Sequence, residues 1–428
     1  MLCALVALLV PIALILRRTT PVYALMLGGL VGGLVGGFGL QGTVAAMVAG
    51  AQGMMGAVLR ILASGILAGA LVKTGAAERL AGTVVRGLGA RFALPAVALA
   101  TALVCAVGVF VDIAVITVAP VALSVGRRAG VPVPALLLAM IGGGKAGNIV
   151  SPNPNTISVA EAFKVDLTTL MLENAVPALV ALAVTVLLAQ HARKRMGGTA
   201  DAAEDRPDTA LADEVVRAEG RGPGLLAALA GPLVVVALLA LRPLCGVAVD
   251  PLVALAAGGL VCVLAAGRAR ETVGICTFGL SQVSGIALLL IGTGTIAGVV
   301  KASTLTADLV SLLASCHLPA FLLAPLSGVL LAGATASTTA GATVASQSFS
   351  NVLLSSGVPA ISAAAMIHAG ATVVDSLPHG SFFHATGGVV GMSVRDRLRL
   401  IPYEALVGLS STLVSVLVFL MASSRASA

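Results

Sequence analysis

Long apolar runs separated by short polar loops make up most of this chain. The first run begins at Leu2 and the last ends near Met421, and most charged residues lie between runs. Runs of this length match the thickness of a lipid bilayer when they form α-helices. The composition agrees, with 58% hydrophobic and 10% charged residues and a mean hydropathy of +1.08. These values exclude a soluble globule and a disordered chain, and we predict an all-α polytopic membrane protein with about ten transmembrane helices.

Two polar, proline-containing segments interrupt apolar runs at matching places in the two halves. The first, KAGNIVSPNPNT, spans Lys145–Thr156, and the second, TVVDSLPHGSFFH, spans Thr372–His384. A helix can break at membrane depth only where protein or a water-filled cavity satisfies the freed backbone groups. We therefore predict broken helices over 132–163 and 359–392. A pair of such breaks at corresponding positions is typical of a transporter's binding site.

The two halves also share a sequence repeat. Gly69 aligns with Gly298 at an offset of 229 residues (298 minus 69), within the similar stretches GILAGALVKTG and GTIAGVVKAST. At a nearby offset, 227 (375 minus 148), Asn148 meets Asp375, so the two broken segments coincide. Matches in the same order at a near-constant offset indicate an internal repeat.

The lysines and arginines in the loops predict how each half crosses the membrane. Placing the basic loops in the cytoplasm turns residues 92–126 into a re-entrant hairpin with its tip near Gly108–Asp112. Residues 318–353, with a polar centre at Gly333–Gly341, form a second hairpin that enters from the opposite side. The two repeats are therefore predicted to be inverted. On this map Arg397 lies in a cytoplasmic loop and Glu404 lies at the membrane interface.

One long polar stretch divides the chain. It runs from Arg193 to Gly222 and is rich in acidic residues, as a solvated linker is. We predict a first half over 1–192, a cytoplasmic linker over 193–222 and a second half over 223–428. A role for the linker as an interaction tail is the alternative.

Polar and ionisable side chains gather at the breaks and at the hairpin tips. Lys145 supplies a fixed cation in an apolar setting, which suits an anionic substrate, and the amino ends of half-helices favour a carboxylate too. Neighbouring hydroxyl and amide groups can bind hydroxyls or carboxylate oxygens. A purely structural reading stays open, in which Asp112 or Asp375 neutralises Lys145 as a buried pair. The candidate substrate-binding residues are Lys145, Asn148, Ser151, Asn153, Asn155, Thr156, Thr335, Ser337 and Thr338.

The second break carries groups that can move a proton. Asp375 lies among histidines, which titrate near neutral pH, and Asp and His recur in the proton relays of membrane proteins. Neither a metal-ligand spacing nor a nucleotide-binding motif occurs in the sequence, so we predict no cofactor or metal and coupling to an ion gradient. The ion is a proton or, alternatively, sodium, which binds side-chain and carbonyl oxygens at such breaks. The candidate proton-coupling residues are Asp112, Asp375, His379 and His384.

These segments resemble the gluconate permease (GntP) family of the ion transporter superfamily. The similarity extends over nearly the whole chain and is most specific in GGGKAGNIVSPNPNT, GATASTTAGATVAS and MSVRDRLRLIPYEALVG. The resemblance implies import of gluconate-like sugar acids, small hydroxy acids or D-serine by proton symport. It also implies a scaffold domain and a transport domain, elevator-type alternating access and a homodimer.

We therefore predict a secondary active transporter that imports a small organic anion across the inner membrane of a bacterium. A sodium-coupled dicarboxylate or amino-acid carrier is the alternative, and a channel or a membrane-embedded enzyme is a third class. The net charge of +7 is spread over loops, where it sets orientation. We expect the lipid bilayer, the anionic substrate and a second copy of the chain as partners, and no nucleic acid.

Overall fold

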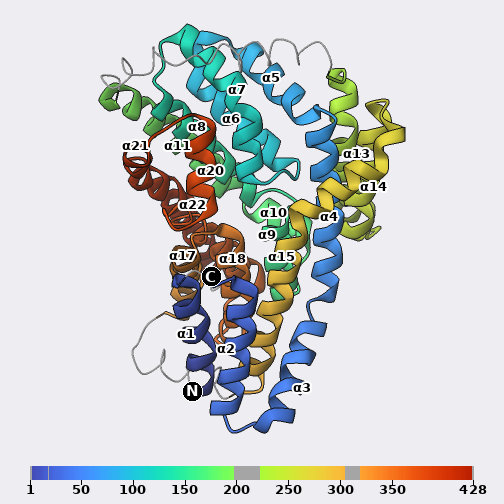
Figure 1. Ribbon diagram of the computed structural model, residues 1–428, viewed down its shortest axis with the longest axis vertical. Helices are drawn as coiled ribbons and strands as arrows, with labels where there is room; N and C mark the ends of the chain where they lie inside the picture. The colour runs from blue at the N-terminus through green and yellow to red at the C-terminus, as the bar shows by residue number, and fades with distance from the viewer. Residues whose placement is uncertain (1, 18, 197–221, 304–318, 427–428) are drawn as a thin grey trace.

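The computed structural model describes residues 2–17, 19–196, 222–303 and 319–426, and within these ranges it contains helices and no strands (Figure 1). Proline and glycine mark many of the helix ends. Pro132, Pro154 and Pro251 lie at or just before helix starts, where a missing N–H is tolerated, and Gly130 ends a helix at φ 57°. Residues 197–221 of the predicted linker and residue 318 of the predicted second hairpin lie outside the described residues.

The first half consists of helices in close succession. Its last long helix continues to Met196, so the start of the predicted linker is helical. In chain order the helices are α1 (Leu2–Leu16), α2 (Pro21–Val35), α3 (Gly39–Gln52), α4 (Met55–Lys73), α5 (Ala76–Leu88), η1 (Ala90–Phe92), α6 (Ala93–Ala106), α7 (Val111–Ala129), α8 (Val133–Ile149), α9 (Pro154–Phe163), α10 (Leu167–Glu173) and α11 (Ala175–Met196).

The second half repeats this order. Between α2 and α14 the offset is 230 residues (251 minus 21), and between α10 and α21 it is 227 (394 minus 167). The described helices of the second half are α13 (Leu225–Cys245), α14 (Pro251–Ala265), η3 (Ala269–Glu271), α15 (Thr272–Lys301), η4 (Ala320–Leu322), α17 (Leu323–Thr335), α18 (Thr338–Ser355), α19 (Ala360–Gly370), α20 (Ser381–Val389), α21 (Val394–Leu398) and α22 (Ile401–Ala426).

The membrane-spanning capacity comes from long apolar helices and from pairs of shorter ones. In the described ranges six helices, or seven if the bent pair α5 and α6 counts as one span, are long and apolar enough to cross a membrane. Shorter apolar helices of 10–17 residues, including α2 and α19, accompany them. The predicted all-α polytopic class is therefore confirmed.

The long α15 and its counterpart, α3 followed by α4, pass close to each other through glycines. A Cβ at Gly50 would lie 2.7 Å from the Cα of Gly298, and one at Gly69 would lie 2.6 Å from the Cα of Gly279. Along α3 and α4 the order is Gly50 then Gly69, whereas the partners along α15 come in the reverse order, so the helices run antiparallel. Each glycine pair is the repeat image of the other, at an offset of 229 (279 minus 50, and 298 minus 69).

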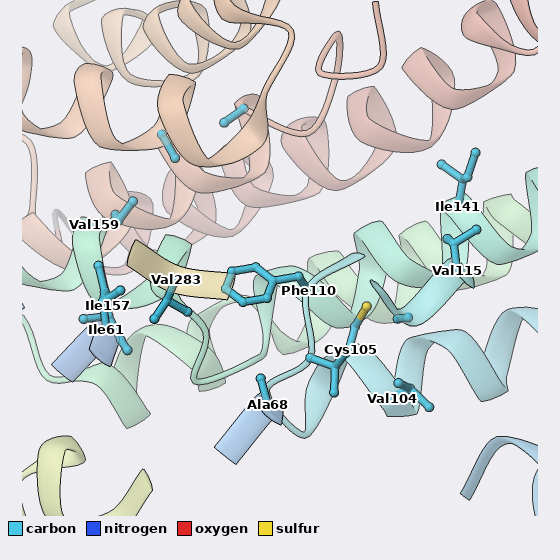
Figure 2. Close-up of a cluster of buried hydrophobic side chains, with 14 of the residues drawn as sticks. Ile61, Ala68, Val104, Cys105, Phe110, Val115, Ile141, Ile157, Val159 and Val283 are labelled. Carbon is cyan, nitrogen blue, oxygen red and sulfur yellow. The ribbon is translucent and has the colours of Figure 1, made fainter. Parts of the chain in front are cut away.

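The helices form two bundles, and most helix–helix contacts lie within one bundle or the other. The first bundle contains α1–α4 and α13–α15, and the second contains α6–α11 and α17–α22; α5 packs against both (Figure 1). Figure 2 shows one place where they meet: Phe110, from the turn before α7, lies in an apolar cluster with Ile61 and Ala68 of α4 and Val283 of α15.

Each predicted break and tip coincides with a gap between helices. Residues 150–153 separate α8 from α9, and residues 371–380 separate α19 from α20. The predicted tips correspond to the turn before α7, where Gly108 has φ 110°, and to the turn before α18, where Ala336 has φ 45°. Entry of these hairpins from opposite sides of a membrane stays a prediction.

Candidate substrate site

Lys145 lies in the last turns of α8 with 2% of its surface exposed. The glycines on either side explain its placement, because a Cβ at Gly143 or Gly147 would lie 2.1 Å from the carbonyl oxygen of Ala98 or Ala102. Only glycine allows α8 to approach α6 so closely, which leaves the lysine on another face of the helix.

Three oxygens from the second half of the chain surround the Lys145 ammonium. Its Nζ donates to the carbonyl oxygen of Thr372 at 2.6 Å and to that of Glu404 at 3.4 Å. It also forms an ion pair with Asp375, whose Oδ1 lies 2.6 Å away. The two broken helices thus meet at this charge, and the charged members of the two breaks neutralise each other.

Asp375 connects the second break to the second hairpin tip. Its Oδ2 accepts a hydrogen bond from the Thr338 hydroxyl at 2.6 Å, and its Oδ1 accepts one from Ser376 at 3.0 Å. The same carboxylate therefore contacts Lys145 through one oxygen and the first turn of α18 through the other.

The asparagines of the first break form a buried network around Asn148. Asn153 caps α9 by accepting from the N–H groups of Asn155 and Thr156, and its Nδ2 donates to Asn148 Oδ1 at 2.6 Å. Asn155 Nδ2 donates to the same oxygen at 3.0 Å. Asn148 Nδ2, Ser151 Oγ and Asn155 Oδ1 are buried and have no hydrogen-bond partner among the described residues. Unpaired buried polar atoms are costly, so these three are available to a ligand.

Four other predicted site residues form hydrogen bonds with backbone groups rather than with Lys145 or Asp375. Thr335 donates back to Leu331 of its own helix at 2.8 Å, and Ser337 caps α18 by accepting from Ala340. His379 and His384 are exposed, and their Nε2 atoms contact the carbonyl oxygens of Ala334 at 3.3 Å and Pro378 at 2.8 Å.

The remaining ionisable candidate, Asp112, lies at the start of α7 and is half-buried. It forms no ion pair with a described residue. The open question of which carboxylate faces Lys145 is therefore answered in favour of Asp375.

Arg397 and Glu404, predicted in a cytoplasmic loop and at the membrane interface, turn out to be buried against each other. Both side chains are 1% exposed and form a buried two-armed ion pair, and Arg397 also lies over the Phe383 ring. The side chain is buried because α21 packs against α20 and Arg397 alone points inward to Glu404, whereas Val394, Arg395 and Leu398 of the same helix are exposed. The membrane side on which this segment lies stays a prediction. Since the Glu404 carbonyl contacts Lys145, this pair lies directly behind the site.

A second residue that the site list left out is His368. It lies on α19, four residues before Thr372, and it is completely buried. Neither ring nitrogen has a hydrogen-bond partner among the described residues. The sequence signal was its position just before the second break.

A paired lysine and carboxylate with unpartnered amide and hydroxyl groups, at two helix breaks inside apolar bundles, are the features of a polytopic membrane transporter. The chain belongs to the GntP permease family, since the sequence model of the family described as GntP family permease matches residues 1–423. It is 51% identical over 417 residues to an uncharacterized transporter of Haemophilus influenzae, which covers 97% of each chain. A second relative from that organism, an uncharacterized permease, is 28% identical over 194 residues, or 45% of this chain and 40% of that protein.

A solved structure shares the fold. The crystal structure of the Alcanivorax borkumensis YdaH transporter, described as having an unusual topology, matches with a TM-score of 0.64 at 16% identity, covering 90% of this chain and 89% of that one. The predicted family is confirmed, and the chain is a membrane transporter rather than an enzyme.

Proposed function

We propose that this permease imports a small organic anion, such as a sugar acid or a hydroxy acid, together with a proton. The observation that carries this proposal is the buried Lys145 ammonium, held by the second break, together with three unpartnered polar atoms in the first break. A buried cation whose neighbours can both donate and accept suits a carboxylate that carries hydroxyl groups.

The polar groups have different parts, some in binding the substrate and some in holding the shape of the site. Lys145 attracts the carboxylate, Asn148 Nδ2 and Ser151 Oγ donate to its oxygens, and Asn155 Oδ1 accepts from a substrate hydroxyl. Asn153 and Thr156 hold the shape of the first break through the cap of α9. Thr335, Ser337 and Thr338 form the second tip, and Thr338 orients Asp375.

Charge neutrality explains why a proton would be transported together with the anion. Lys145 and Asp375 balance each other in a site from which water is largely excluded. A substrate carboxylate added to this pair would leave one uncompensated negative charge, which is costly in a medium of low dielectric constant. A proton taken up by Asp375 removes that charge and frees Lys145 for the substrate, so one proton accompanies one monoanion. Asp112, His379 and His384 are the further candidates for delivering it.

The two halves would act as inverted repeats in an elevator-type movement. The antiparallel crossing of α3 and α4 with α15, with repeat-related glycine contacts, supports a two-fold axis perpendicular to these helices. Such an axis lies in the membrane plane when the helices cross the membrane. The first bundle would be the scaffold and the second the moving domain, in a homodimer within the inner membrane of a bacterium.

Sodium is the alternative coupling ion, in a carrier of dicarboxylates or amino acids. It is favoured by the unpartnered oxygens Ser151 Oγ and Asn155 Oδ1, because sodium binds hydroxyl, amide and carbonyl oxygens at helix breaks. Uptake into proteoliposomes under a proton gradient alone and under a sodium gradient alone separates the two. Stimulation by sodium and none by protons would reject proton coupling.

The central test is Lys145→Ala, compared with Lys301→Ala at the exposed end of α15. Purified protein is first screened against sugar acids, hydroxy acids and amino acids for a ligand that raises its melting temperature. We expect Lys145→Ala to remain folded but to lose both the thermal shift and uptake of that ligand, whereas Lys301→Ala keeps both. Normal uptake by Lys145→Ala would overturn the assignment.

A further inference from the structure

A cluster of six charged residues lies between the two bundles, away from Lys145. It surrounds a cavity of about 460 Å³. The first bundle contributes Arg60 of α4, Arg242 of α13 and Asp250, which caps α14; the second contributes Glu161 of α9 and Lys164 and Asp166 from the turn between α9 and α10. We refer to these six residues as the ionic cluster.

The ionic cluster joins the bundles through two sets of contacts. Arg60 bonds to both oxygens of Asp250, at 3.1 and 2.8 Å, within the first bundle. It also reaches across to Glu161 at 2.5 Å, and Glu161 in turn pairs with Lys164 at 2.5 Å. Arg242 pairs with Asp166 across the same gap. The end of the first broken helix is thereby attached to the first bundle.

None of the ion pairs in the cluster is reproduced by the equivalent residues of the other repeat. Asp250 precedes Pro251 as Thr20 precedes Pro21, so these two residues are equivalent at the offset of 230. For α13 the offset is 224, because Gly258 packs on Gly231 and Val235 as its equivalent Gly28 packs on Ala7 and Pro11. At that offset the residue equivalent to Arg242 is Arg18. At offsets of 229 for α4 and 227 for α9 and α10, the residues equivalent to Arg60, Glu161, Lys164 and Asp166 are Leu289, Gly388, Gly391 and Ser393.

The backbone at Lys164 supports a specific requirement for charge. Lys164 has φ 54°, in the left-handed region, and the equivalent Gly391 has φ 65°. Glycine adopts this conformation without penalty, whereas an L-residue is strained in it. The first repeat therefore keeps a lysine where the fold favours glycine, and that lysine binds Glu161.

We propose that the ionic cluster is a one-sided latch that stabilises the arrangement of the bundles seen here over the other end of the transport movement. The proposal rests on the proposed function. In a carrier built from inverted repeats, the contacts made by one repeat in one state are taken over by the equivalent residues of the other repeat in the opposite state. Because no pair of those equivalent residues carries opposite charges, the latch exists in only one state and shifts the equilibrium toward it.

Exposure to solvent limits how far the ionic cluster can shift the equilibrium between the two states. The Arg60 side chain is 29% exposed and that of Asp250 is 45% exposed, so each ion pair is screened and contributes modestly. We expect removal of Glu161, which breaks the link to Arg60 and the link to Lys164, to change the ratio of the two states on the order of fivefold.

The experiment measures the distance between the bundles by spin labels at Leu172 on α10 and Leu244 on α13, both exposed. The six native cysteines are replaced beforehand. Glu161→Gln and Arg60→Gln are expected to populate a second distance, and high salt is expected to do the same to the unmutated cluster. Glu271→Gln is the matched control, because it removes an exposed pair with Arg268 that lies within the first bundle. We expect its distances to match those of the parent.

Measuring anion uptake in parallel distinguishes failure of the latch from failure of the proposed function. If the parent protein transports an anion but Glu161→Gln and Arg60→Gln give the same distances as Glu271→Gln, the latch is overturned and the proposed function stands. If no anion is taken up, the proposed function fails, and the distances still decide the latch: a second population in the two variants supports it, and one unchanged distance in every variant rejects it.

Discussion

Lys145 and Asp375 belong to different broken helices, 230 residues apart (375 minus 145), and their charged atoms lie 2.6 Å apart. Lys145 also donates to the carbonyl oxygen of Thr372, the residue that occupies its own place in the second repeat at the offset of 227. In the proposed arrangement of inverted repeats, contact between repeat-equivalent positions puts this charge pair close to the axis that would relate the halves. A group there is reached equally from both repeats, which is the place where a carrier binds substrate in alternating states.

The role of Asp375 in coupling can be tested with Asp375→Asn. The amide cannot take up a proton, so we expect proton-driven accumulation of the anion to be lost while exchange of internal for external anion continues. Measuring accumulation and exchange in the same proteoliposomes separates these steps. Asp396→Asn, which alters an exposed carboxylate paired with Arg399, is the control and should keep both activities. Intact proton-driven accumulation by Asp375→Asn would show that another group carries the proton.

The link between the second tip and the ion pair predicts unequal effects at two threonines. Thr338 donates to the Asp375 carboxylate, whereas Thr335 donates to backbone carbonyl oxygens, those of Leu331 in its own helix and of Ser337 in the following turn. The change Thr338→Val removes one hydrogen bond to a charged group, worth about 1.5–3 kcal/mol, so we expect the Kd of the anion to rise at least tenfold. We expect Thr335→Val to leave the Kd within about twofold, because that hydroxyl donates to the carbonyl oxygens of Leu331 and Ser337 and not to Asp375. Equal affinities in the two variants would argue against a role for Thr338 in positioning Asp375.

Local signals in the sequence were sufficient to find the breaks. Pro152 and Pro154 end one helix and start the next, and the polar residues beside them have no place in lipid, so this break could be predicted from neighbouring residues alone. The repeat offset then led to Asp375 as the partner position. The contact between Lys145 and Asp375 was left open, because Asp112 was an equal candidate on sequence grounds.

Features that depend on tertiary packing could not be found in this way. The arginine Arg397 looks like a loop residue until α21 folds back and buries it against Glu404. The apolar runs indicate membrane helices near Val22–Phe38, Met54–Val72 and Ile286–Val300, which leave out α3 and the first half of α15. Gln41, Gln52 and several Ser and Thr residues lower the hydropathy of these two segments. Both are parts of the same element in the two repeats, so a single misreading produced both errors.

The buried pair of Arg397 and Glu404 predicts a large effect on stability. Glu404→Gln leaves the Arg397 charge buried without its counterion, and losing one partner of such a pair costs about 3–5 kcal/mol. We expect a clearly lower melting temperature in detergent. Asp396→Asn, at the exposed pair on the same short helix, should melt like the parent. Similar melting of all three proteins would mean that the pair contributes little to the fold.

The glycine crossing predicts matched effects in the two repeats. A Cβ at Gly50 would lie 2.0 Å from the carbonyl oxygen of Gly294, and a Cβ at the equivalent Gly279 would lie 2.1 Å from that of Gly65. Backbone cannot move aside as a side-chain end can, so Gly50→Ala and Gly279→Ala should each destabilise the protein by about 1–3 kcal/mol. In Gly274→Ala the new methyl group on α15 meets no atom within 4 Å, and better helix propensity should leave its stability equal or slightly higher. Thermal unfolding of the three variants measures this, and a loss confined to one of the two equivalent glycines would contradict a symmetric crossing.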